Sequence, residues 1–148
     1  MRFFGTDLSS DAATIAATSH ERIMTSVRDH RDLRAWQKAV DLGVQCYQLS
    51  RSFPREELYG LTKQLRDSAV SVAANIAEGN GRLTTGEYLN SLSVARGSLR
   101  EVDTHLEFAL RLEYAAPRAI DDVRLLLDAD AALLTRLIMR IKEGGRRR

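Results

Sequence analysis

The sequence predicts an all-α fold, an up-down-up-down antiparallel four-helix bundle. Three observations lead to it. Apolar residues recur at steps of three and four in four successive stretches, short breaks containing Pro or Gly separate these stretches, and no stretch shows the alternation of a β-strand. The length of 148 residues suits one domain. Because the connections are short, consecutive helices must run antiparallel.

The first helix is expected to begin near Leu33. Its predicted apolar stripe consists of Leu33, Trp36, Val40, Val44 and Tyr47. Phe53 precedes Pro54, and a residue before proline is pushed out of the helical region, so the helix should end before this pair. We expect Cys46, the only cysteine, to be a small core residue.

The second helix is expected to open at Pro54 and to end at Gly79-Asn80-Gly81, where glycine tolerates a left-handed cap. Its stripe consists of Leu58, Leu61, Leu65, Ala69, Val72 and Ile76.

Ten residues of this helix, from Ser68 to Ala77, carry no charge. A helix that is small or apolar all the way round must be covered on more than one side. A second copy of the chain is the simplest source of that cover, so we expect a homo-oligomer. The residues expected to be structural or to contact another copy are Ser68, Val70, Ala73, Asn75, Ala77, Glu78, Gly97, Ser98 and Glu101.

Four of these residues form two polar pairs with a spacing of three. Asn75 and Glu78 end the second helix, and Ser98 and Glu101 lie in the middle of the third. In antiparallel neighbours they could meet in a buried hydrogen-bond network that fixes the helix register, or alternatively in a ligand site. Gly97 is unfavourable inside a helix, which indicates close backbone approach by a neighbour.

The third helix should begin at a capping box made by Thr84 and Glu87 and run to about Tyr114. Its stripe consists of Tyr88, Leu92, Ala95, Leu99, Val102 and Leu106. Pro117 is expected to open the fourth helix. The stripe of the fourth helix consists of Ile120, Val123, Leu127, Ala131, Leu134, Ile138 and Ile141.

The bundle should occupy residues 31–144. Residues 1–30 lack sustained periodicity and are expected to be a flexible extension, with a start at Met24 as an open alternative. Residues 145–148 form a basic tail. Charged residues interrupt the N-terminus and no run is long enough to span a bilayer, so we expect a cytoplasmic protein.

The second helix resembles the signature of a known family. The matching words are Phe53-Pro54, Glu57, Tyr59-Gly60-Leu61-Thr62, Gln64-Leu65-Arg66, Ser68-Ala69-Val70-Ser71 and Asn75-Ile76-Ala77-Glu78-Gly79. The other helices add Leu33, Trp36, Glu87-Tyr88, Ala95, Gly97-Ser98-Leu99 and Glu101. With these words, residues 31–142 resemble the 23S rRNA intervening-sequence protein family. That family is similar to the accessory variability-determinant proteins of diversity-generating retroelements. The resemblance implies a homopentameric ring with affinity for nucleic acid and a reverse transcriptase as a possible protein partner.

The net charge of +2 hides a basic C-terminal end, where residues 135–148 carry six basic side chains against Glu143 alone. The candidate nucleic-acid-binding residues are Lys63, Arg66, Arg96, Arg100, Arg140, Arg146, Arg147 and Arg148. Simple surface ion pairs are the alternative explanation, since Asp67 is beside Arg66 and Asp103 is three residues from Arg100.

No residue pattern indicates a nucleophile with its base, a phosphate-binding glycine loop or paired zinc ligands. We therefore expect a non-enzymatic oligomeric scaffold or adaptor without a cofactor, which binds RNA or DNA through its arginines. One alternative is a ferritin-like metal-binding bundle that uses Glu78, Glu101 and His105 in its interior. Another is an adaptor that binds only protein, such as a reverse transcriptase.

Overall fold

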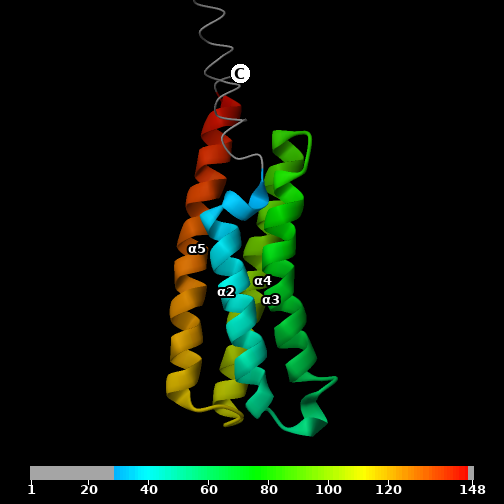
Figure 1. Ribbon diagram of the computed structural model, residues 1–148, viewed down its shortest axis with the longest axis vertical. Helices are drawn as coiled ribbons and strands as arrows, with labels where there is room; N and C mark the ends of the chain where they lie inside the picture. The colour runs from blue at the N-terminus through cyan, green and yellow to red at the C-terminus, as the bar shows by residue number, and fades with distance from the viewer. Residues whose placement is uncertain (1–28, 147–148) are drawn as a thin grey trace, which may run out of the picture.

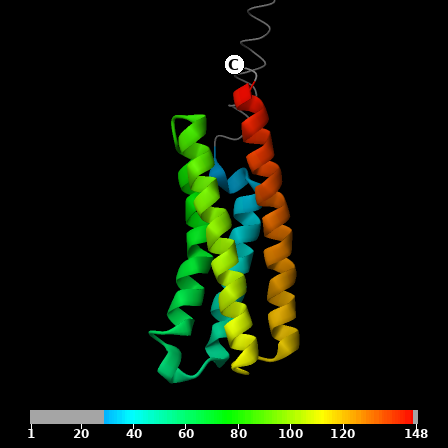
Figure 2. The ribbon, with the colours of Figure 1, turned by 180° about the vertical axis from the view of Figure 1, so that it is seen from behind.

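The computed structural model describes residues 29–146, which form four long helices (Figure 1). These are α2 (Arg34–Leu49), α3 (Leu61–Asn80), α4 (Thr85–Arg111) and α5 (Pro117–Arg146). Three short 3₁₀ turns, η1 (His30–Asp32), η2 (Ser50–Ser52) and η3 (Arg55–Glu57), lie before and between them. Consecutive long helices run in opposite directions (Figures 1 and 2), and residues 29–146 contain no strand. The all-α prediction is confirmed.

The predicted outer segments lie largely outside the described residues. Only Asp29 and His30 of the proposed flexible extension, and Gly145 and Arg146 of the proposed tail, are described. Gly145 and Arg146 continue α5, so the helix extends beyond the expected boundary at residue 144. Within the described ranges, no helix is long and apolar enough to cross a membrane.

The stripe predicted for α4 is confirmed. Five of its six residues are buried, and Tyr88 packs partly buried against the core. The capping box is also present, because Thr84 Oγ1 accepts a hydrogen bond from Glu87 N–H at 3.2 Å and the Glu87 carboxylate accepts one from Thr84 N–H at 3.2 Å. The hydrogen bond from the Thr84 side chain lowers the pKa of Glu87. These two contacts satisfy backbone donors that the first helical turn leaves unpaired.

The predicted face of α2 is wrong for Val40, Val44 and Tyr47, although Leu33, directly before the helix, is buried as expected. The buried residues of α2 are Ala35, Ala39, Leu42 and Cys46. Val44 and Tyr47, which the sequence assigned to the core, are 49% and 44% exposed. Both faces of this helix are apolar in sequence, so periodicity could not separate them. Cys46 is buried as expected, and burial raises the pKa of its thiol to about 12.

Helix α3 begins later than predicted, at Leu61 rather than at Pro54. The carboxylate of Glu57 caps the start of the helix, because its Oε2 accepts a hydrogen bond from Leu61 N–H at 2.8 Å. The other oxygen, Oε1, accepts a hydrogen bond from the Tyr114 hydroxyl at 3.0 Å. Leu58 is exposed and outside the helix, so its place in the predicted stripe is wrong. The helix ends at Asn80 as expected, but Gly81 has φ −86°, so no left-handed cap ends it.

Close packing between helices requires a glycine at position 79 rather than at position 97. A Cβ on Gly79 would lie 2.7 Å from Tyr88 Cδ2 and 3.1 Å from Ser91 Cβ, whereas nothing described lies within 4 Å of a Cβ on Gly97. The expectation of close approach at Gly97 is therefore wrong within one subunit. Gly79 allows the end of α3 to pack tightly on the start of α4.

Sequence patterns missed Asp130 of α5. Its side chain is completely buried among core residues, and neither carboxylate oxygen has a hydrogen-bond partner within residues 29–146. Burial raises the pKa of Asp130 to about 7, and the positive charge of Lys38 on α2 partly opposes that rise. Asp130 occupies a core position next to Ala131, which the sequence assigned to the core and which is only partly buried.

Candidate assembly groove and basic surface

An apolar groove runs along the outside of the contact between α2 and α3. It has a volume of about 510 Å³. The side chains that form most of it are Trp36, Val40, Val44 and Tyr47 from α2 and Val70 and Ala73 from α3. The misassigned stripe of α2 therefore forms one wall, and the uncharged run of α3 forms the other. We call this surface the α2–α3 groove.

Small residues line the centre of the groove. Gly43 of α2 faces the backbone of α3, where a Cβ added to Gly43 would lie 4.0 Å from the carbonyl oxygen of Ala69. Val70 is 50% exposed, and Ala73 is partly buried. An isolated subunit thus leaves an apolar depression open to water, which costs free energy in proportion to its apolar area.

Two arginines lie at the end of the groove where α2 ends. Arg66 donates from Nε to Ser50 Oγ at 2.8 Å, and its guanidinium carbon lies 4.8 Å from the centre of the Tyr47 ring. Arg51 lines the same end and is exposed. The groove is therefore apolar along most of its length and positively charged at one end.

The opposite side of α3 forms a polar contact with α4. The Ser71 and Ser98 hydroxyls are 2.9 Å apart, and Asn75 Nδ2 donates to the Ser71 carbonyl at 2.8 Å and to Ser71 Oγ at 3.0 Å. Ser68 Oγ lies 3.2 Å from His105 Nδ1. Asn75 and Ser98 are therefore joined through Ser71, a residue that sequence reasoning had not selected.

The two predicted glutamates do not belong to this network. Glu78 forms an ion pair with Arg82 on its own helix, and Glu101 is exposed. His105 is partly buried, and burial lowers its pKa although the Glu101 carboxylate opposes the shift. The interior metal site proposed for Glu78, Glu101 and His105 is thus wrong in its placement. In residues 29–146, no group of three or more His, Cys, Asp or Glu side chains is arranged to hold a metal ion.

The candidate nucleic-acid-binding residues divide into two sets. Lys63 forms an ion pair with Asp67, and Arg66 is held by Ser50 and Tyr47. The others within the described residues are exposed and have no ion-pair partner there: Arg96, Arg100, Arg140 and Arg146. Arg147 and Arg148 lie outside the described residues.

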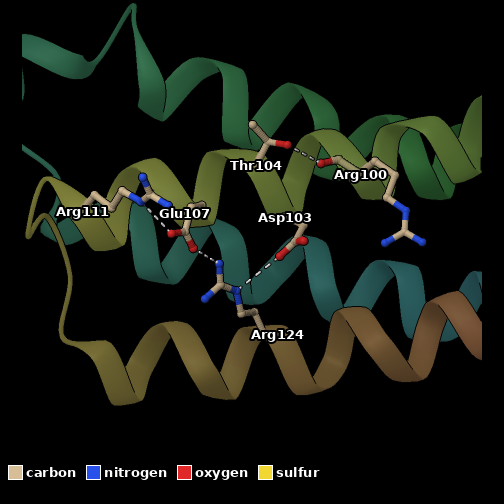
Figure 3. Close-up of polar contacts among 6 residues, drawn as sticks. All are labelled: Arg100, Asp103, Thr104, Glu107, Arg111 and Arg124. Atoms are coloured by element: carbon tan, nitrogen blue, oxygen red, sulfur yellow. Dashed lines mark hydrogen bonds and ion pairs between the residues drawn. The ribbon is translucent and has the colours of Figure 1, made fainter.

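An ion-pair network between α4 and α5 explains why Arg100 has no ion-pair partner within residues 29–146 (Figure 3). Arg124 of α5 donates from Nε to Asp103 Oδ1 at 3.3 Å and from Nη2 to Glu107 Oε2 at 2.6 Å. Arg111 donates to the other oxygen of Glu107 at 2.8 Å. These hydrogen bonds lower the pKa of Glu107, the bond from Arg124 most. Asp103 is thus bound by Arg124, so the expected pair of Asp103 with Arg100 is wrong.

Charge is unevenly distributed along α4 and α5. The C-terminal end of α5 lies beside the start of α4, since a Cβ on Gly145 would be 3.3 Å from Thr85 Cγ2. In this half of the two helices, residues 85–100 and 132–146 contain six basic and two acidic residues. The other half, together with the connection between the two helices, is residues 101–131 and contains eight acidic and three basic residues. The arginines without an ion-pair partner in the described residues therefore lie in a half of net positive charge.

Comparisons with known proteins agree with this architecture. A crystal structure of a protein with unknown function from the S23 ribosomal protein family of Bacteroides thetaiotaomicron VPI-5482 is similar, with a TM-score of 0.65 and 23% sequence identity. The similarity covers 70% of this chain and 97% of that chain, and it shows the fold alone.

No curated protein matches the sequence. The family model described as 23S rRNA-intervening sequence protein matches residues 31–136, which include all of α2, α3 and α4 and much of α5. The chain therefore belongs to the 23S rRNA-intervening sequence protein family.

Proposed function

We propose that the protein is a non-enzymatic helical scaffold that assembles with copies of itself into a ring and binds nucleic acid at its basic end. The α2–α3 groove is the observation that carries self-assembly. It exposes the uncharged run of α3 together with Trp36, Val44 and Tyr47 of α2. An apolar surface of this kind is typical of a protein–protein contact.

A second copy is the proposed occupant of the groove. Arg51 lines the groove where α2 ends, and Arg66 contacts Ser50 and Tyr47 at the same place. A mainly apolar surface with acidic groups at one end would therefore suit the groove. The chain itself has such a surface on α5, which is described below. A homopentamer is the form of ring that we propose.

Nucleic-acid binding is supported by the arginines that have no carboxylate partner within residues 29–146. Arg96 and Arg100 are exposed on α4, and Arg140 and Arg146 are exposed on the half of α5 that lies beside the start of α4. A single subunit offers few phosphate contacts. Repeating the same arginines around a ring would multiply a weak attraction without any new contact within the subunit.

Molar mass measured by light scattering tests the assembly. We expect a mass of several subunits for the wild-type protein and of one subunit for Val70→Glu, which places a charge in the apolar groove. Leu83→Glu is the matched control, because Leu83 is 97% exposed on the connection between α3 and α4. A monomeric wild-type protein at high concentration would contradict the proposed assembly.

Salt-titrated binding to RNA and DNA tests the second part. The double variant Arg96→Ala/Arg100→Ala should weaken binding and reduce the slope of log K against log salt by about 1 for each lost phosphate contact. Arg118→Ala, an exposed arginine in the acidic half, is the control. An assembled ring that binds neither nucleic acid at low salt would instead favour the alternative proposal, an adaptor for a protein such as a reverse transcriptase.

A further inference from the structure

Helix α5 carries a second exposed stripe on the side opposite its core residues. The stripe follows steps of four and three and consists of Leu125, Ala129, Ala132, Arg136 and Met139. All five are exposed, and Leu125 and Met139 are 69% and 56% exposed. We call this surface the outer stripe of α5. A spacing of this kind is that of a helix side that packs against other helices.

The shape of the outer stripe suits the α2–α3 groove. The groove is an open channel between two antiparallel helices, and its α3 wall contains small residues, Ala69, Ala73 and Ala74. A third helix packs well in such a channel when it places large residues at its ends and small residues at its centre. Leu125 and Met139 lie at the two ends of the outer stripe, and Ala129 and Ala132 lie next to each other along it near its centre. Arg136, between Ala132 and Met139, is the one charged residue of the stripe.

Charge gives the docking a direction. Arg51 and Arg66 lie at the groove end where α2 finishes, which is the end of the bundle where α5 begins (Figure 1). The exposed charged residues along that first part of α5 are three aspartates, Asp121, Asp122 and Asp128, and one arginine, Arg118, so its net charge is negative. Two copies that point the same way would therefore place these carboxylates near the two arginines. Copies that point in opposite ways would instead bring two further arginines, Arg136 and Arg140, toward Arg51 and Arg66.

We propose that the outer stripe of α5 in one copy occupies the α2–α3 groove of the next copy, with both copies pointing the same way. This inference rests on the proposed function and names the two surfaces through which the copies would assemble. Because the two surfaces differ, the contact is head-to-tail, and repeating it produces a closed ring when the rotation between copies closes. The parallel orientation also gathers the basic ends of all copies at one rim.

Mixing two monomeric variants tests the inference. Val70→Glu blocks the groove but leaves the outer stripe intact, and Leu125→Glu blocks the stripe but leaves the groove intact. We expect each variant alone to have the mass of one subunit by light scattering. Mixed in equal amounts they should form a one-to-one heterodimer, because one groove and one stripe remain able to pair.

Circular dichroism of each variant checks that it is folded, and Leu83→Glu should assemble as the wild type does. Leu125→Glu that assembles like the wild-type protein would overturn the inference while the proposed self-assembly stands. A mixture that stays monomeric would also overturn it, since an intact groove and an intact stripe would then be present and fail to pair. A wild-type monomer would instead contradict the proposed function itself.

Discussion

Helix α3 packs against α4 on one side and against α2 on the other, and the two contacts differ in how far they exclude water. Toward α4, serine hydroxyls pair with each other and with Asn75, and Gly79 permits close packing. Toward α2, Val70 remains half exposed beside Tyr47. One side of α3 is therefore complete within the subunit, and the other is open.

The comparison shows that an uncharged helical run can have two causes. In the run from Ser68 to Ala77, the serines are accounted for by hydrogen bonds within the subunit. No contact within the described chain explains why Val70 and Ala73 are uncharged, because nothing there covers the groove that they line. Only this second group forms the exposed apolar surface that the proposed partner would cover.

The largest expected difference is between core and groove residues of the same helix. Ile76 is completely buried, so Ile76→Ala should lower the free energy of unfolding by about 2–5 kcal/mol. Val70→Ala should change it by less than about 0.5 kcal/mol in the dissociated protein, because the side chain already contacts water. Urea denaturation at low protein concentration measures both. Equal losses of unfolding free energy in the two variants would contradict the claim that Val70 lies on an open side of α3.

Asp130 contrasts with the paired serines because it is buried without a partner. Its folded-state pKa of about 7 exceeds the usual 3.8, so the folded state holds a proton that the unfolded state has lost. Stability should therefore fall as pH rises from about 4 to about 7, by on the order of 4 kcal/mol, and stay level above.

Unfolding at a series of pH values checks this expectation. Asp130→Asn should remove most of the fall, because its side chain keeps the shape but cannot ionise. Asp128→Asn changes an exposed aspartate of the same helix and should keep the wild-type profile. An unchanged pH profile in Asp130→Asn would show that Asp130 ionises as an ordinary aspartate.

The two glycines give the next effect. Gly79→Ala should destabilise the protein by about 1–3 kcal/mol, since the new methyl group would meet the Tyr88 ring and Ser91. Gly97→Ala should stabilise the subunit by up to about 1 kcal/mol, because alanine favours the helix and meets nothing described. Thermal denaturation of both variants compares them. Destabilisation by Gly97→Ala would show that Gly97 packs against something beyond the subunit.

The smallest effect is expected for the serine contact itself. Ser98→Ala removes the partner of Ser71, but Asn75 still donates to that hydroxyl, so the loss should be about 1 kcal/mol. Denaturant unfolding against Ser93→Ala, an exposed serine of the same helix, measures it. A loss as large as that of Ile76→Ala would mean that the polar side, rather than the core, stabilises α3.

Much of the fold could be predicted because α4 and α5 have one dominant apolar face each, set off by charged residues. Helix α2 could not be assigned in this way, since its core face of Ala35, Ala39 and Leu42 is smaller than the face of Trp36 and Val44 that lines the groove. Periodicity finds apolar faces but cannot say which one the subunit buries.

The candidate sites were less predictable, because they depend on which side chains meet across helices. Sequence spacing joined Asp103 to Arg100 on one helix, but Arg124 reaches Asp103 from α5. Asp130 was invisible to hydrophobic patterns, since a carboxylate is expected at the surface. The uncharged run did indicate an apolar surface beyond the core, since its Val70 and Ala73 line the groove, and the cover by a second copy stays a prediction.

The most direct test of the open side is the fluorescence of Trp36, the only tryptophan of the chain, which lines the α2–α3 groove. If another copy covers the groove, the emission of the wild-type protein should be shifted to shorter wavelength than that of Val70→Glu at the same concentration. On dilution it should move toward the emission of the variant. Identical emission of the two proteins at every concentration would contradict the account.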